Sequence, residues 1–290
     1  MINRTLKFLL IFSGLLIFAG IILIFSVLFG LNIVPAEKEI VLYIPESASY
    51  SQAMDSIKAH TPVKHPAVFD WIARRKNYPV NVKPGRYVIR HKMSYVEAIN
   101  MFRSGDQAPV NVTFNNIRTL YDLAGKIGGQ ISADSTAIAD FFNDTANYSG
   151  DGFSRENIIS VFIPNTYQFF WNTNAKELYR RMLKENRKFW NDERKSKAEA
   201  IGMTPAEVST LASIVDDEAG KADEKPRIAG VYLNRLKRGI PLQADPTIKF
   251  ALNDFSLTRI LKKHLQIDSP YNTYLNGGLP PGPIGCPTIE

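Results

Sequence analysis

A long run without a charged side chain, from Phe8 to Ala36, constrains this chain more than any other feature. Its apolar part exceeds the roughly 20 residues needed to cross a bilayer, whereas the apolar region of a cleaved signal peptide has only about 7–15 residues. Arg4 and Lys7 precede the run, and the positive-inside rule keeps such an N-terminus in the cytoplasm. We therefore expect residues 1–7 in the cytoplasm, one uncleaved transmembrane helix at 8–34, and an exported remainder, which excludes most classes of cytosolic enzyme.

The composition narrows the choice of partners and cofactors. A formal net charge of +7 fits either a generic basic surface or an anionic partner, such as a membrane face or an acidic polymer. We find no basic stripe with interleaved aromatic residues, so nucleic acid is not an expected partner. Cys286 is the single cysteine, which excludes an intramolecular disulfide, a Cys-rich zinc site and an iron–sulfur cluster.

The histidines do not suggest a metal centre. They are His60, His65, His91 and His264. Their scattered positions lack the spacing of metal ligands, so a metal enzyme is the least favoured class and we expect neither a metal nor a cofactor.

Residues 38–108 read as a small α+β unit. An alternating strand begins at Glu39, and a second strand follows the Pro-Gly turn of "KPGRYVIRH". Ser94 and Glu97 have the spacing of a capping box at the start of a helix, and Gly105 stops that helix. Short amphipathic helices are expected between the two strands.

Residues 109–290 read as a larger α+β unit. The segment "PVNVTF" at its start alternates like a strand, and helices are expected near 120–127 and 175–199. The segment 161–171 is unusually aromatic for a connector. It fits either core packing or an aromatic wall for a sugar ring, with Tyr167 as a candidate contact.

The segment 204–220 is a well-marked helix that ends in three acids. Thr204 and Glu207 form a capping box, Pro205 occupies the first position, and Gly220 can end the helix. An apolar helix that leads directly into three carboxylates has two explanations. The acids are either a solvated helix end, or one of them is held against an apolar surface for proton chemistry.

A helical projection separates the three acids. At about 100° per residue, Glu218 lies beside Leu211 on the apolar stripe, Asp217 lies on the opposite face and Asp216 lies on the flank. A carboxyl on an apolar face loses hydration of its charged form, so its pKa should rise. Such a group is suited to general-acid catalysis on a glycosidic oxygen. The competing structural explanation is a Glu218 side chain paired to a nearby arginine or lysine, for example Arg227 or Arg235.

Two polar loops follow the acidic helix. "PLQADPT" presents Gln243 and Asp245 after a turn at Gly239, and the Gly/Pro-rich segment "SPYNTYLNGGLPPGPIGCP" presents further rings and an amide. Amides and acids bond hydroxyl groups, and rings stack on pyranose faces. The candidate glycan contacts are Asp216, Gln243, Asp245, Tyr271, Asn272, Tyr274 and Tyr167.

The blocks "KPGRYVI", "LASIVDDEAG", "VYLNRL", "PLQADPT", "YNTY" and "GLPPGPI" resemble, in this order, the endolytic murein transglycosylases of the YceG-like family. The resemblance implies a plasma (inner) membrane protein with a LysM-like glycan-binding unit at 38–108 and a catalytic domain at 109–290. It implies cleavage of the MurNAc–GlcNAc bond in nascent strands, which leaves a 1,6-anhydro-MurNAc end and terminates strand elongation. The catalytic acid of the family falls on Glu218, the residue that the projection selected.

The resemblance also sets the expected partners and the limits of the domain. The partners are peptidoglycan glycan strands and the lipid bilayer, with wall-synthesis proteins as an open question. Similar proteins continue past "GLPPGPI", so we expect the catalytic domain to be truncated at its C-terminus. Two other functions remain open. One is a non-catalytic, membrane-anchored scaffold that binds peptidoglycan, and the other is a hydrolase with Asp216 or Asp245 as a second carboxylate.

Overall fold

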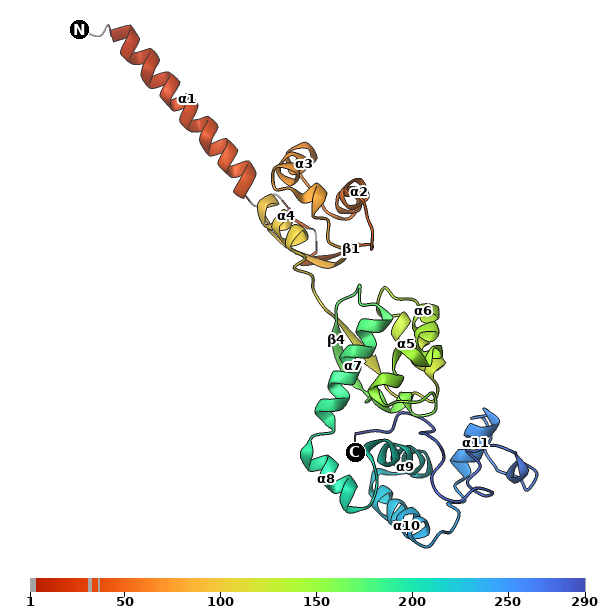
Figure 1. Ribbon diagram of the computed structural model, residues 1–290. Helices are drawn as coiled ribbons and strands as arrows, with labels where there is room; N and C mark the ends of the chain where they lie inside the picture. The colour runs from red at the N-terminus through yellow and green to blue at the C-terminus, as the bar shows by residue number, and fades with distance from the viewer. Residues whose placement is uncertain (1–3, 31–32, 36, 290) are drawn as a thin grey trace. The chain divides into compact units, whose positions relative to one another are not determined.

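The computed structural model describes residues 4–30, 33–35 and 37–289 (Figure 1). It divides into two compact units. Unit 1 comprises Met1–Val110 with Phe170–Asn172, and unit 2 comprises Asn111–Phe169 with Thr173–Glu290. Each unit combines helices with a two-stranded sheet, which confirms the expected α+β class.

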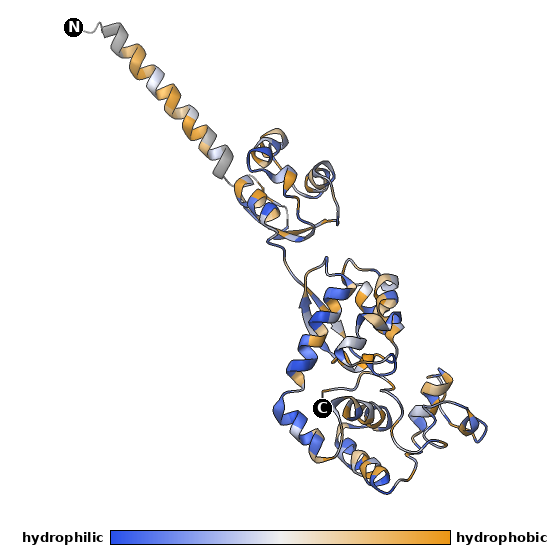
Figure 2. Cartoon of the chain, viewed as in Figure 1, coloured by the Kyte–Doolittle hydropathy of each residue, from blue (hydrophilic) through white to orange (hydrophobic). Residues whose placement is uncertain are grey.

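Helix α1 (Arg4–Phe29) opens the chain. Large apolar side chains along it are exposed, with Phe8 at 71% and Ile17 at 64%, and Figure 2 colours much of the helix as hydrophobic. Within the described residues, no helix reaches the length and apolarity that a membrane crossing requires. The transmembrane helix predicted at 8–34 is therefore not shown, and residues 31–32 of that range lie outside the described residues.

A two-stranded sheet and three helices enclose the core of unit 1. β1 (Glu39–Ile44) pairs antiparallel with β2 (Gly85–Arg90). The helices are α2 (Tyr50–His60), α3 (Pro66–Arg75) and α4 (Tyr95–Ser104). Alternate residues of the strands pack with aromatic residues of the helices, and the buried set includes Leu42, Ile44, Tyr87, Ile89, Phe69 and Phe102. The capping box of Ser94 and Glu97 and the left-handed Gly105 at the end of α4 confirm the predicted limits of this helix.

Unit 2 has two parts. The first holds β3 (Val110–Phe114), which pairs with β4 (Asn165–Phe169), and the helices α5 (Leu120–Gly128), α6 (Ser135–Asn143) and α7 (Ala175–Phe189). The second holds α8 (Asp192–Ala200), α9 (Pro205–Glu218), α10 (Lys225–Lys237) and α11 (Asp245–Leu252). Short 3₁₀ turns lie at Tyr78–Val80 in unit 1 and, in unit 2, at Thr145–Asn147, Ser149–Asp151, Ile158–Val161, Ala222–Glu224 and His264–Gln266.

Helix α9 lies at the centre of the second part. Its Leu211, Ile214 and Val215 are at most 6% exposed. They form one core with Tyr232 of α10 and with residues of the following loops, including Leu242 and Ile284. This packing fixes the direction of α9 and therefore the place where its acidic end emerges.

Two sequence expectations were wrong in detail. The single helix expected at 175–199 is interrupted, because Trp190 leaves the helical backbone region and Asn191 caps α8 by accepting the Arg194 N–H at 2.9 Å. The aromatic segment 161–171 contains strand β4 and is not a connector. Figure 2 shows α8 as hydrophilic over most of its length, in agreement with its expected solvated face.

Candidate active site

The acidic end of α9 is built by local sequence signals. Thr204 caps the helix: its hydroxyl accepts the Glu207 N–H, and the Glu207 carboxylate accepts the Thr204 N–H, which is the predicted capping box. The helix ends at Glu218, and Ala219 already has an extended backbone with ψ 124°. Glu218 is therefore the last helical residue, two positions before Gly220, and the residue as a whole is exposed.

The Glu218 carboxyl is not part of an ion pair. Among the described residues it has no hydrogen-bond or ion-pair partner. Arg235, one of the partners that the structural explanation offered, instead donates to the carbonyls of Pro241 and Leu242 at 3.1 and 2.7 Å. The dense surroundings of the α9 end raise the pKa of Glu218, and the negative charges of Asp245 and Asp217 raise it further against the opposing charge of Lys249. Among the described residues, no cluster of three or more His, Cys, Asp or Glu side chains could hold a metal ion.

The Asp216 carboxylate is bound by two neighbouring residues of the fold. Its carboxylate pairs with Lys225 Nζ at 2.6 Å and accepts the Thr288 hydroxyl and N–H at 2.9 and 3.2 Å. Burial acts to raise the pKa of Asp216, but these partners outweigh it and hold the pKa below its usual range. Asp216 therefore stays ionised and bonded within the fold, a position that does not favour the predicted role in glycan binding.

Asp217 is exposed, as the helical projection predicted, but it has a partner that the projection did not show. Arg118, in the loop between β3 and α5, donates to both of its carboxylate oxygens at 3.0 and 2.7 Å. The same guanidinium lies over the Phe255 ring at 4.6 Å from its centroid. Arg118 thus joins the end of α9 to two segments far from it in sequence. A projection of one helix could not show this partner.

Asp245 and Tyr274 form a bonded pair near Glu218. The Tyr274 hydroxyl donates to Asp245 Oδ1 at 2.6 Å. Asp245 is not a loop residue, as expected from sequence, but the first residue of α11, where Pro246 fits the opening turn and an acid is favoured by the helix dipole. Burial and the Asp245 bond raise the pKa of Tyr274 to about 12, with a further contribution from Glu218. Tyr232 of α10 lies in the same charge environment, and burial and Glu218 raise its pKa as well.

Three other predicted contacts occupy different positions. Gln243 is exposed with a left-handed backbone, φ 54°, and its Oε1 accepts from Arg235 at 3.2 Å. Asn272 is fully buried, and its amide donates to the carbonyls of Leu265 and Ile267 at 3.0 and 2.8 Å. Tyr271 is half-buried. Asn272 therefore holds the shape of the loop that carries Tyr271 and Tyr274, rather than an open binding surface.

Tyr167 and Cys286 are interior residues. Tyr167 is 9% exposed, stacks on Phe114 at 5.6 Å between ring centroids, and donates its hydroxyl to the Ile163 carbonyl. This favours core packing over the sugar wall considered above. Burial raises the pKa of the Cys286 thiol to about 12, so the thiol is not a nucleophile near neutral pH.

Sequence reasoning missed the residues that support the acidic end. Arg118, Lys225 and Thr288 bind the two aspartates, and the charge of Lys249 acts to lower the pKa of Glu218. Tyr232 lies in the block "VYLNRL", whose pattern alone gave no role to the ring. Only the three-dimensional contacts identify these residues. Together they define an acid–base site with one unpaired carboxyl of raised pKa, flanked by two aspartates that have partners.

The comparisons with known proteins identify the family of the chain. The model of the YceG-like family matches residues 42–290, so the chain belongs to the YceG-like family. A Streptococcus pneumoniae protein named endolytic murein transglycosylase is 28% identical over 288 residues, which cover 88% of this chain and 51% of the relative. A Bacillus subtilis protein of the same name is 35% identical over 150 residues, covering 51% of this chain and 39% of the relative.

A solved yceG-like protein from Listeria monocytogenes shares the fold. It aligns with a TM-score of 0.55 and 24% identity, over 86% of each chain. The chain spans about half the length, or less, of the curated relatives it matches. The activity of the whole protein is therefore a matter for proposal.

Proposed function

We propose that this chain is a lytic transglycosylase that cuts within peptidoglycan strands. The bond cleaved is the MurNAc–GlcNAc bond, and the product carries a 1,6-anhydro-MurNAc end, which terminates elongation of the strand. Membership of the YceG-like family and the printed names of the relatives support this proposal. The single observation that carries it is the Glu218 carboxyl, unpaired among the described residues and with its pKa raised by its surroundings.

One carboxyl is sufficient for this reaction. The protonated Glu218 donates its proton to the glycosidic oxygen as the bond from that oxygen to muramyl C1 breaks. The Glu218 carboxylate then accepts the proton of the muramyl C6 hydroxyl as O6 bonds to C1 and closes the anhydro ring. The nucleophile belongs to the bound sugar, so ring closure benefits from proximity. A hydrolase needs a second carboxylate to activate water or to attack the anomeric carbon.

The neighbours of Glu218 set its protonation. Asp245 raises the Glu218 pKa by its charge, and the Tyr274 hydroxyl holds the Asp245 carboxylate in place. We assign glycan contacts to the exposed Gln243 and to the Asp245–Tyr274 pair, with Tyr271 beside them. Asn272, Asp216 and Tyr167 support the site through the fold.

Mass spectrometry of peptidoglycan products tests the proposal. Glu218→Gln keeps the shape of the side chain and removes the titrating proton, so we expect the yield of anhydro-muramyl ends to fall by about 10²–10⁴-fold. Glu199→Gln, at an exposed acid on α8, is the matched control and should leave the yield unchanged.

The products also separate the alternatives. Products heavier by one water would establish a hydrolase. Equal yields of anhydro-muramyl ends from Glu218→Gln and the parent chain would remove the catalytic assignment. Binding to peptidoglycan without any product would leave the membrane-anchored scaffold as the better function.

Membrane attachment is a separate proposal. It is supported by the charge-free run from Phe8 to Ala36, the preceding Arg4 and Lys7, and the exposed apolar side chains of α1. The remaining chain would lie outside the cytoplasm, where unit 1 meets glycan strands as the LysM-like unit. Alkaline carbonate extraction of membranes tests attachment, since a peripheral protein is released by it and a spanning protein is retained.

A further inference from the structure

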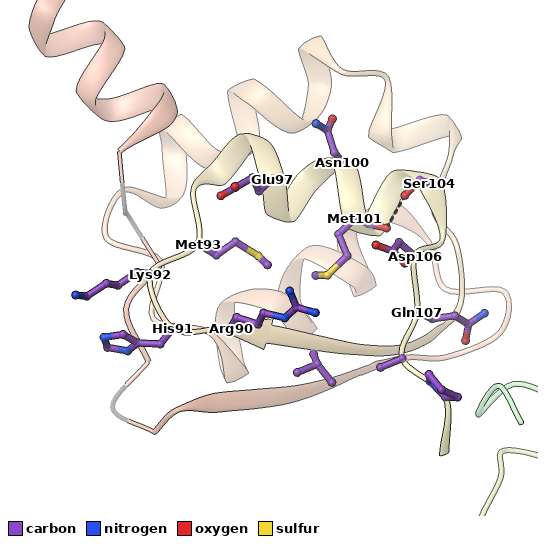
Figure 3. Close-up of a pocket in the computed structure, with 13 residues that line it drawn as sticks. Arg90, His91, Lys92, Met93, Glu97, Asn100, Met101, Ser104, Asp106 and Gln107 are labelled. Atoms are coloured by element: carbon purple, nitrogen blue, oxygen red, sulfur yellow. Dashed lines mark hydrogen bonds between the residues drawn. The ribbon is translucent and has the colours of Figure 1, made fainter. Parts of the chain in front are cut away.

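Unit 1 has a groove that the proposed reaction does not use. It encloses about 710 Å³ between β2 and α4 (Figure 3). Val88 and Arg90 of β2 line one side, and Asn100 and Met101 of α4 line the other. Its described lining includes no Phe, Tyr or Trp side chain. The groove therefore lacks the aromatic rings on which a sugar face stacks.

One wall of the groove is a strand edge with available backbone groups. His91 donates its N–H to the Lys38 carbonyl at 3.1 Å, one step beyond the pairing of Arg90 with Glu39. Successive residues of an antiparallel strand direct their backbone groups to alternate sides. Val88 and Arg90 therefore direct theirs away from β1. The sheet of unit 1 has two strands among the described residues, so this edge of β2 carries no further strand there.

The segment after α4 shows that this edge accepts an extended chain. Ala108 donates its N–H to the Arg86 carbonyl at 2.8 Å, at one end of the edge. The adjacent Gln107 also lines the groove, and its buried Oε1 has no hydrogen-bond donor among the described residues. The N–H and C=O groups of Val88 and Arg90, which also point away from β1, can bind a ligand that offers both N–H and C=O groups.

The charges of the groove favour an acidic ligand. Arg90 and Lys92 lie toward one end, and Asp106 lies toward the other (Figure 3). Glu97 also lines the groove, but its carboxylate already accepts the N–H and the hydroxyl of Ser94, both at 2.8 Å. Glu97 stays ionised while it accepts these bonds, which lower its pKa, so the Arg90 end holds two cations against one acid and keeps a positive charge.

We propose that this groove binds an extended acidic peptide segment, which adds a strand to the free edge of β2 and places its carboxylates against Arg90 and Lys92. Strand addition supplies affinity through main-chain hydrogen bonds, and alternate side chains supply specificity. Met93 and Met101 give these side chains an apolar surface that adapts to their shape. The inference concerns unit 1 alone and stands apart from the chemistry at Glu218.

Fluorescence anisotropy with the full chain tests this inference. The probe is a labelled octapeptide of alternating threonine and valine that carries two glutamates. Two comparison peptides replace the glutamates by glutamines or place a proline in the middle, which prevents strand pairing. We expect each comparison peptide to bind about fivefold more weakly or worse, since one loses the charges and the other the backbone bonds.

Matched charge reversals locate the site. Arg90→Glu should weaken binding of the acidic peptide by about fivefold or more, because a cation that faces the ligand becomes an anion. Arg103→Glu makes the same change at an exposed position of α4 outside the groove and should alter binding by less than about twofold. In hydrogen exchange, the peptide should protect the amides of Val88 and Arg90.

Three results would overturn the inference. They are equal binding of the acidic and proline-interrupted peptides, equal effects of Arg90→Glu and Arg103→Glu, and protection of the Val88 and Arg90 amides by peptide-free glycan strands in place of the peptide. The last result would assign the groove to sugar.

Discussion

Replacement of Asp216 by asparagine should weaken the fold far more than the chemistry. The Asp216 carboxylate pairs with Lys225 Nζ at 2.6 Å and accepts two hydrogen bonds from Thr288. Asparagine keeps an acceptor for Thr288 but leaves the Lys225 ammonium without its counter-charge. The side chains of Asp216 and Lys225 are only 24% and 19% exposed, so water replaces the lost partner incompletely.

The size of the effect follows from this partial burial. Breaking a fully buried pair costs about 3–5 kcal/mol, whereas exposed pairs contribute about 0–1 kcal/mol. For the intermediate exposure of this pair we expect a loss of about 2 kcal/mol in the free energy of unfolding. In a unit of this size, such a loss lowers Tm by about 4–8 °C. Asp217→Asn breaks a more exposed pair with Arg118 and should cost about 0–1 kcal/mol.

Thermal unfolding followed by circular dichroism measures this difference, and the yield of anhydro-muramyl ends at 25 °C measures the chemistry. The pKa of Asp216 is depressed in the fold, so its contribution is present above the unfolded pKa and is lost as pH falls through the folded pKa. The gap in stability between the parent and Asp216→Asn should therefore be constant from neutral pH down to about 5 and shrink below about 4. An unchanged Tm together with a tenfold loss of product would refute this reasoning and return Asp216 to the glycan surface.

Three further outcomes are expected. The proposed reaction requires the acid form of Glu218, whose pKa is raised, so activity should fall as pH rises through that pKa, and Asp245→Asn should move the fall to lower pH; an unmoved profile would exclude coupling of the two acids. Asn272→Ala leaves the carbonyls that its amide bonds unsatisfied and should lower stability by about 2 kcal/mol in urea unfolding, a loss that a surface glycan contact would not produce. Cys286 should react with a thiol reagent only after unfolding, and rapid reaction of the native chain would contradict its burial.

Local signals in the sequence predicted the elements that local chemistry determines. The capping boxes at Ser94 and Thr204 gave the starts of two helices, and alternation in "PVNVTF" gave a strand. The interruption between α7 and α8 escaped prediction because it depends on Asn191 acting as a cap inside a continuous charged segment. The start of a helix at Asp245 was not predicted, because the sequence of the segment "PLQADPT" is also typical of a loop.

The surroundings of the three acids of α9 were predicted less completely. The projection separated the three acids, but it could not show that Asp217 meets Arg118 or that Asp216 meets Thr288, since those partners lie 99 and 72 residues away in sequence. It correctly predicted that burial raises the pKa of Glu218, although the residue as a whole is exposed at the end of the helix. Contacts over such separations depend on the whole fold and have no local pattern.

The long-range hydrogen bonds that hold α9 also determine when its acidic end reaches its final structure. Ser213 accepts the Ile284 N–H across 71 residues, and Thr288 bonds Asp216 across 72. Contacts of this separation form slowly, because a long loop must close before they return any free energy. During synthesis the segment around Ile284 leaves the ribosome long after Glu218, so the acid acquires its final surroundings late. In an emerging chain the acidic end of α9 therefore lacks its final contacts until the segment around Ile284 has packed against the helix.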